Sequence, residues 1–160
     1  MPVEIRAFSP ADVDAIVEFS LRAWAPVFES FEKVLGREIF LRAYPDWLAS
    51  QARDVTRTCT EHAEHTWVAV ADGRPAGFAT SIFDEAASTG EIEMIAVDPE
   101  FQRRGIAAAL IEHSLEHMRK AGLTLAGIGT GGDPGHAPAR AAYEKAGFTP
   151  LPLVHYYKAL

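Results

Sequence analysis

The chain has 160 residues, 48% of them hydrophobic and 23% charged, which is ordinary for a globular protein, so we expect one domain over residues 1–160. The net charge of −7 argues against nucleic acid as a partner, because phosphate backbones need a concentrated positive surface. Cys59 is the only cysteine, which excludes an intrachain disulfide and fits a reducing compartment. Without a signal-peptide pattern or an apolar run long enough to span a membrane, we expect no membrane contact and a cytoplasmic protein.

The N-terminal segment predicts a strand and then a helix. Residues 3–8 alternate apolar and polar side chains, as a half-buried strand does. Ser9 and Pro10 are typical of a helix start, and we expect this helix to end near Trp24 because Pro26 follows.

Beyond this helix the pattern becomes less regular and then periodic again. Residues 27–40 are rich in aromatic side chains, and a second helical stretch over residues 38–56 is expected to be interrupted or kinked near Pro45. Asp72-Gly73 is a hairpin turn signal. Three strands are expected over residues 66–71, 76–83 and 91–97, followed by a helix over residues 104–121. A parallel strand over residues 124–128, a short helix over residues 138–146 and one or two final strands over residues 148–156 complete the chain.

The segment Gln102-Arg103-Arg104-Gly105-Ile106-Ala107 joins a strand to a helix and carries the first chemical signal. The first amides of a helix have no helical partner and lie at its positive end, so they bind anions. Gly105 leaves room for ligand oxygens near the backbone. The alternative is an ordinary loop with two surface arginines.

Val97-Asp98-Pro99, followed by Gln-x-x-Gly-x-Ala, resembles the acyl-coenzyme A signature of the GNAT (Gcn5-related) N-acetyltransferases. The resemblance implies an α/β GNAT fold with a mixed sheet of six to seven strands, about four helices and the order β-α-α-β-β-β-α-β-α-β-β. It implies acetyl-CoA as co-substrate, no metal, a pyrophosphate held by backbone amides and a pantetheine arm paired with the strand. The residues implied in these contacts are Ile95, Ala96, Val97, Gln102, Arg103, Arg104, Gly105, Ile106 and Ala107.

A second resemblance lies in Ala139-x-x-x-Tyr143-x-x-x-Gly147-Phe148. It implies that Ala139 contacts the cofactor and that Tyr143 donates a proton to the departing thiolate. The alternative for Tyr143 is a ring packed on the sheet with its hydroxyl in water. His136 stands where the family usually has an asparagine that contacts CoA. It either replaces that contact, joins a proton relay, or caps the short helix.

Glu91 and Glu93 are candidate bases for the acceptor amine. Two residues apart on a strand, they should share one face with Ile95 and Val97. The resemblance implies that a glutamate here acts directly or through water. We favour Glu93, whose burial would suit a base, and expect Glu91 to be solvated, although a β-bulge would change the choice.

The acceptor is expected to be a primary amine of a small molecule, bound near Trp24, Phe28, Glu29 and Phe31, because aromatic rings with interleaved carboxylates suit a cation. The alternative for these residues is a core or an interface. No nucleophile lies in either motif, so we expect direct transfer in a ternary complex. Acetylation of a protein N-terminus or lysine, or a non-catalytic CoA sensor, are the alternatives. A homodimer through the last strand is a further expectation.

Two histidines, His62 and His65, lie near Cys59 in the sequence. No fourth ligand accompanies them, so we expect surface residues and no metal site.

Overall fold

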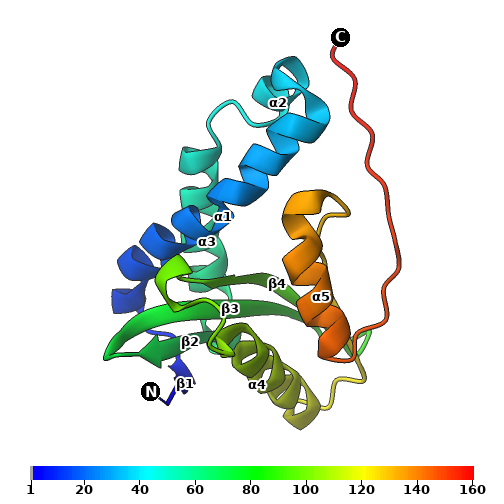
Figure 1. The fold of residues 1–160 in the computed structure, drawn as a ribbon. Helices are drawn as coiled ribbons and strands as arrows, with labels where there is room; N and C mark the ends of the chain where they lie inside the picture. Colours follow the sequence, from blue (N-terminus) through cyan, green and yellow to red (C-terminus); the bar gives the residue numbers. More distant parts are fainter. Residues whose placement is uncertain (1) are drawn as a thin grey trace.

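The computed structural model describes residues 2–160, and Figure 1 shows its fold. One mixed sheet has the strand order β1-β2-β3-β4-β5. Neighbours are antiparallel from β1 to β4, whereas β4 and β5 are parallel, as the sequence predicts for a strand reached through a helix. The strands are β1 (Glu4–Ala7), β2 (Thr66–Ala71), β3 (Arg74–Asp84), β4 (Thr89–Val97) and β5 (Leu125–Ile128).

Helices cover both faces of this sheet (Figure 1). α1 and α3 pack on one face around Phe19 and Phe78, and α4 packs on the other around Ile106 and Leu110. The helices are α1 (Val13–Leu35), α2 (Arg37–Ala43), α3 (Trp47–Glu61), α4 (Ile106–Lys120) and α5 (Ala137–Lys145). Short 3-10 turns are η1 (Pro10–Asp12), η2 (Ala63–His65), η3 (Pro99–Phe101) and η4 (Pro134–His136). Within residues 2–160, no helix has both the length and the apolar character that a bilayer crossing requires.

The sheet has five strands in the described chain, so the expectation of six to seven is wrong. Residues 148–156, expected to form one or two strands, form an extended irregular segment that passes α5 and runs toward α2 (Figure 1). Pro150 and Pro152 explain this difference, because a proline has no N–H to donate to a strand ladder.

α1 continues through Pro26 to Leu35, so the predicted end near Trp24 is wrong. Proline in a helix removes one hydrogen bond, and packing can outweigh that loss. Here buried Ile16 and Phe19 precede Pro26, and buried Phe28 follows it. The predicted interruption near Pro45 is confirmed, because α2 ends at Ala43 and α3 begins at Trp47.

A β-bulge interrupts the pairing of β3 with β4. Thr80 pairs with Met94 but its neighbour Ser81 pairs with Ile92, so Glu93 is the extra residue. The bulge places Ile92 in the same cluster as Ile95 and Val97, on the α4 face. The expectation that Glu91 shares that face is therefore wrong.

Candidate functional site

A cavity of about 810 Å³ lies between α1, β4, the β4–α4 turn and α5. Its position follows from the sheet. β4 pairs with β5 only from Thr89 to Ile92, whereas residues 93–97 of β4 line the cavity. The β5 side of this last half of β4 therefore presents backbone groups to the cavity instead of to a neighbouring strand.

The β4–α4 turn forms one end of the cavity. Ala109 N–H donates to the Gly105 carbonyl at 3.0 Å, which is the first i to i−4 bond of α4, so the amides of residues 105–108 precede the helical ladder. Gly105 has φ of +79°, in the left-handed region, and no protein atom lies within 4 Å of where a Cβ would be. The fold thus requires this glycine for its conformation, and the open space beside it fits an anionic group at the helix start.

Side chains of this turn point in different directions. Gln102 and Arg103 line the cavity, and Gln102 Nε2 donates to the Val97 carbonyl at 3.2 Å. Arg104 instead lies over the Phe101 ring and pairs with Asp72 at 3.9 Å. Only its backbone is a candidate for the contact that the sequence predicts.

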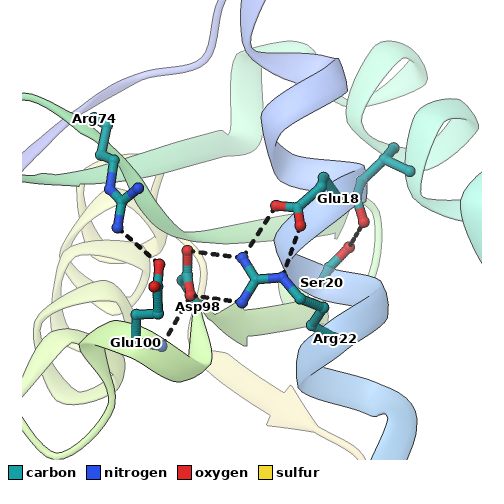
Figure 2. Close-up of polar contacts among 7 residues, drawn as sticks. Glu18, Ser20, Arg22, Arg74, Asp98 and Glu100 are labelled. Atoms are coloured by element: carbon teal, nitrogen blue, oxygen red, sulfur yellow. Dashed lines mark hydrogen bonds and ion pairs between the residues drawn. The ribbon is translucent and has the colours of Figure 1, made fainter.

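A buried carboxylate, Asp98, fixes the start of the turn to α1. Arg22 Nη1 and Nη2 donate to Asp98 at 3.1 and 3.2 Å, and the same guanidinium bonds Glu18 (Figure 2). The Glu100 amide donates to Asp98 Oδ1 at 2.9 Å. Burial would raise the pKa of Asp98, but the bonds from Arg22 and the Glu100 amide outweigh it and lower this pKa. Asp98 is therefore a stable anion with a permanent countercharge.

α5 supplies the wall that carries Ala139 and Tyr143, both of which line the cavity. The Tyr143 ring packs against the α4-side cluster, with its centroid 6.4 Å from that of Phe148. Burial raises the pKa of Tyr143, so the phenol keeps its proton at neutral pH. Tyr143 thus packs its ring on the core and also lines the cavity, which is compatible with a proton donor at this place.

A chain of three polar side chains connects α1 with the β5–α5 loop. Ser30 Oγ, on α1, donates to Asp133 Oδ2 at 2.5 Å, and His136 Nδ1 lies 2.5 Å from Asp133 Oδ1. Burial would raise the pKa of Asp133, but the bonds from Ser30 and His136 outweigh it and lower this pKa. His136 lines the cavity and occupies the N-cap position of α5, where its side chain makes no capping hydrogen bond.

Both glutamates of β4 are exposed, as expected for Glu91, but their surroundings differ. Glu93, at the bulge, lines the cavity but is exposed, so the expected burial is not found. Glu91 lies over Gly127 of β5, where an added Cβ would collide with its carboxylate. Burial, followed by the nearby charge of Glu93, raises the pKa of Glu91.

Aromatic side chains of α1 form another part of the cavity wall. Trp24, Phe28 and Phe31 line it, as the acceptor hypothesis requires. Phe28 stacks on Trp47 of α3 at 4.4 Å, which joins this wall to the core as well. Glu29 does not line the cavity; it lies on the exposed side of α1 and pairs with Lys33 at 3.2 Å, so its expected substrate contact is not supported.

One histidine away from the cavity also differs from expectation. His65, expected at the surface, stacks on Phe83 at 3.7 Å between ring centroids, and its Nδ1 lies 2.9 Å from His117 Nε2. It is thus a packed residue of the α4 side of the sheet.

Sequence reasoning missed the roles of Asp98 and Asp133 as anchors and their partners on α1. Asp133 precedes His136 by three residues, a spacing that was a usable signal. No sequence signal pointed to Ser30 or Arg22, because their partners lie 103 and 76 residues away in the chain.

Known proteins resemble this chain in sequence and structure. The model of the Acetyltransferase (GNAT) family matches residues 33–148. A mycothiol acetyltransferase of Saccharomonospora viridis is 31% identical over 91% of this chain and 45% of its own length. A [ribosomal protein bS18]-alanine N-acetyltransferase of Escherichia coli is 33% identical over 54% of this chain and 55% of its own length. This chain thus spans about half the length of these two relatives.

A solved structure shows the same fold. The PaiA N-acetyltransferase of Thermoplasma acidophilum, in complex with coenzyme A, superposes with a TM-score of 0.70 at 17% identity, over 91% of this chain and 88% of that one.

Proposed function

Because this chain belongs to the GNAT acetyltransferase family, we propose that it transfers the acetyl group of acetyl-CoA to a primary amine of a small molecule. The main support for this proposal is that a single cavity is lined by the start of α4, by Tyr143 and by the aromatic side chains of α1. A donor with an anionic end and an acceptor with an apolar body fit opposite parts of this cavity.

The donor end suits coenzyme A. The amides of residues 105–108 and the Arg103 side chain favour the pyrophosphate. No strand of the described chain pairs with residues 95–97 on the β5 side, and this edge offers backbone groups to the amides of the pantetheine arm, as a neighbouring strand would. Acetyl-CoA bound there supplies the activated acetyl group.

Tyr143 is the proposed general acid. An ordinary thiol has a pKa of about 8.5, so a departing thiolate benefits from a proton donor. The raised pKa of Tyr143 keeps that proton available at neutral pH. General acid catalysis contributes about 100-fold to 10,000-fold.

Direct transfer to the acceptor is proposed because no activated nucleophile lies in the cavity. Burial in α3 raises the pKa of Cys59 to about 12, and this thiol does not line the cavity. It is therefore unsuited to carry the acetyl group.

The acceptor amine needs a proton acceptor, because an alkylammonium has a pKa of about 10.4 and cannot attack. Glu93 and His136 are the basic groups that line the cavity. With Trp24, Phe28 and Phe31 beside them, they favour an amine on an apolar or aromatic body. A polycationic acceptor would need more carboxylates than this wall carries.

A protein N-terminus is the second candidate acceptor. The relative named a ribosomal protein bS18 alanine N-acetyltransferase supports it. An N-terminal alanine offers a primary amine beside a small apolar side chain, which is compatible with the same wall.

Acetyl-CoA turnover tests the proposal. Thiol release is measured with 2-phenylethylamine, spermidine and an alanine-initiated peptide, for the wild type and Tyr143→Phe. We expect the aromatic amine to be the best of the three and Tyr143→Phe to lose at least about 100-fold in kcat with unchanged acetyl-CoA affinity. Acetyl-CoA binding without acceleration by any amine would favour a non-catalytic CoA sensor.

A further inference from the structure

We propose that His136 is the general base for the acceptor amine and that Asp133, held by Ser30, is its positioning residue. This inference rests on the proposed function and names a group that the family resemblance assigns to cofactor contact. Its main support is a series of hydrogen bonds that runs from Ser30 on α1 through Asp133 to His136 at the cavity.

Asp133 determines which nitrogen of His136 is available. An ionised carboxylate only accepts hydrogen bonds, so the short contact between Asp133 Oδ1 and His136 Nδ1 requires a proton on Nδ1. In a neutral imidazole the other nitrogen, Nε2, is then an acceptor. Asp133 thus gives His136 the tautomer that a base needs and stabilises the imidazolium that forms.

Asp133 has no permanent cation of its own. Its second oxygen is taken by a neutral hydroxyl, that of Ser30. Arg140 of α5 donates to the carbonyls of Gly131 and Asp133, at 2.7 and 2.8 Å, and not to the carboxylate. The negative charge therefore remains available to compensate a protonated His136.

The glycines of the loop fit around this chain of side chains. A Cβ on Gly131 would collide with Asp133 Oδ1 and come within 2.6 Å of His136 Nδ1. A Cβ on Gly135 would come within 2.8 Å of Ser30 Oγ, which instead accepts the Gly135 amide at 3.0 Å. Two glycines thus make space for the arrangement, which indicates that the loop is built around it.

His136 lines the cavity beside an aromatic side chain of α1. The ring centroid of Phe31 lies 5.4 Å from that of His136, and α5 carries Tyr143 seven residues further along the chain. A base and an acid thus line the same cavity from one helix and its first turn.

Protons and bonds balance with these two groups. His136 Nε2 takes one proton from the acceptor ammonium and releases it to solvent after turnover. The neutral nitrogen bonds the acetyl carbon as the carbon–sulfur bond breaks, and Tyr143 gives its proton to the sulfur. The nitrogen's second proton returns to Tyr143, so the products are the amide, the thiol and one proton.

Chemical rescue tests the base. With 2-phenylethylamine as acceptor, we expect His136→Ala to lose about 100-fold or more in kcat and added imidazole to restore at least about tenfold of it. The matched control, His155→Ala, removes an exposed histidine outside the cavity and should behave as wild type. If His136→Ala keeps full activity, or loses acetyl-CoA affinity without rescue, the inference is overturned.

A spectroscopic measurement tests the positioning role without turnover. In wild type, nitrogen NMR of the neutral His136 ring should show the proton on Nδ1, and Asp133→Asn should shift the tautomer population. A proton on Nε2 in the wild type would overturn the inference. Failure of every amine with a correct tautomer would instead contradict the proposed function.

Discussion

Two loops border the cavity, and each is tied to α1 by one aspartate, which is buried at Asp98 and half-buried at Asp133. At the β4–α4 turn, Asp98 is neutralised by Arg22, a cation that keeps its charge at all relevant pH values. At the β5–α5 loop, Asp133 bonds the hydroxyl of Ser30 and the ring of His136. The first arrangement only holds backbone in place. The second leaves a charge available for a group that changes its protonation, so it fits a catalytic role.

Removing Arg22 should have the largest effect on stability. In Arg22→Met, Asp98 keeps the Glu100 amide but loses its countercharge, and we expect the free energy of unfolding to fall by about 2 to 3 kcal/mol. The value lies below that for a fully buried pair because the Arg22 side chain is 41% exposed. Urea denaturation measures it. Glu18→Gln, which removes the exposed partner of the same arginine, should change it by less than about 0.5 kcal/mol.

The same pair predicts a pH dependence. The folded pKa of Asp98 is lowered, so its contribution to stability is complete above the ordinary value of 3.8 and is lost as pH falls through the folded pKa. Urea denaturation should show that the free energy of unfolding decreases as the pH is lowered from about 5 to about 3. Asp98→Asn should flatten part of this fall, and an unchanged slope would contradict the assignment. The effect is smaller than that of losing Arg22, because protonation leaves no buried charge.

A glycine pair probes the second loop. Gly131→Ala should cost about 1 to 3 kcal/mol in unfolding free energy through its collision with Asp133 and His136. It should also lower turnover, because the imidazole is displaced. The control is Gly132→Ala, where nothing lies within 4 Å of the added Cβ, and it should remain near wild type in both measurements. Equal effects of the two substitutions would show that the loop is not built around Asp133 and His136.

Ser30→Ala should have the smallest effect. It removes one hydrogen bond to Asp133 and one from the Gly135 amide, and we expect a loss of about 1 kcal/mol, seen as a lower melting temperature. The histidine would keep its Asp133 contact, so turnover should fall less than in Asp133→Asn. A larger loss of activity than in Asp133→Asn would make Ser30 the more important partner.

Local patterns predicted most of the fold because they act over a few residues. The parallel β5, the break near Pro45 and the two motif helices follow from periodicity, prolines and glycines. The length of α1 did not follow, because packing on both sides of Pro26 outweighs a local rule. The predicted final strands do not form, because here the local rule applies: Pro150 and Pro152 have no N–H to donate to a strand ladder.

The site was predicted where a motif holds its residues together. Tyr143, Ala139 and the turn around Gly105 line one cavity, as the resemblance implies. Glu91 left the expected face because the bulge at Glu93 depends on pairing with β3, which no local pattern reveals. Ser30 and Asp133 meet across 103 residues, so only the folded chain brings them together.

Pro26 gives α1 a mechanical property. A proline at this position has no N–H to bond the carbonyl four residues earlier, which is that of Arg22. The weakest point of the helix backbone therefore lies between the anchor of one loop, Arg22, and the anchor of the other, Ser30. Bending at this point would move Phe28 and Phe31, which line the cavity after Pro26, relative to the β4–α4 turn held by Arg22.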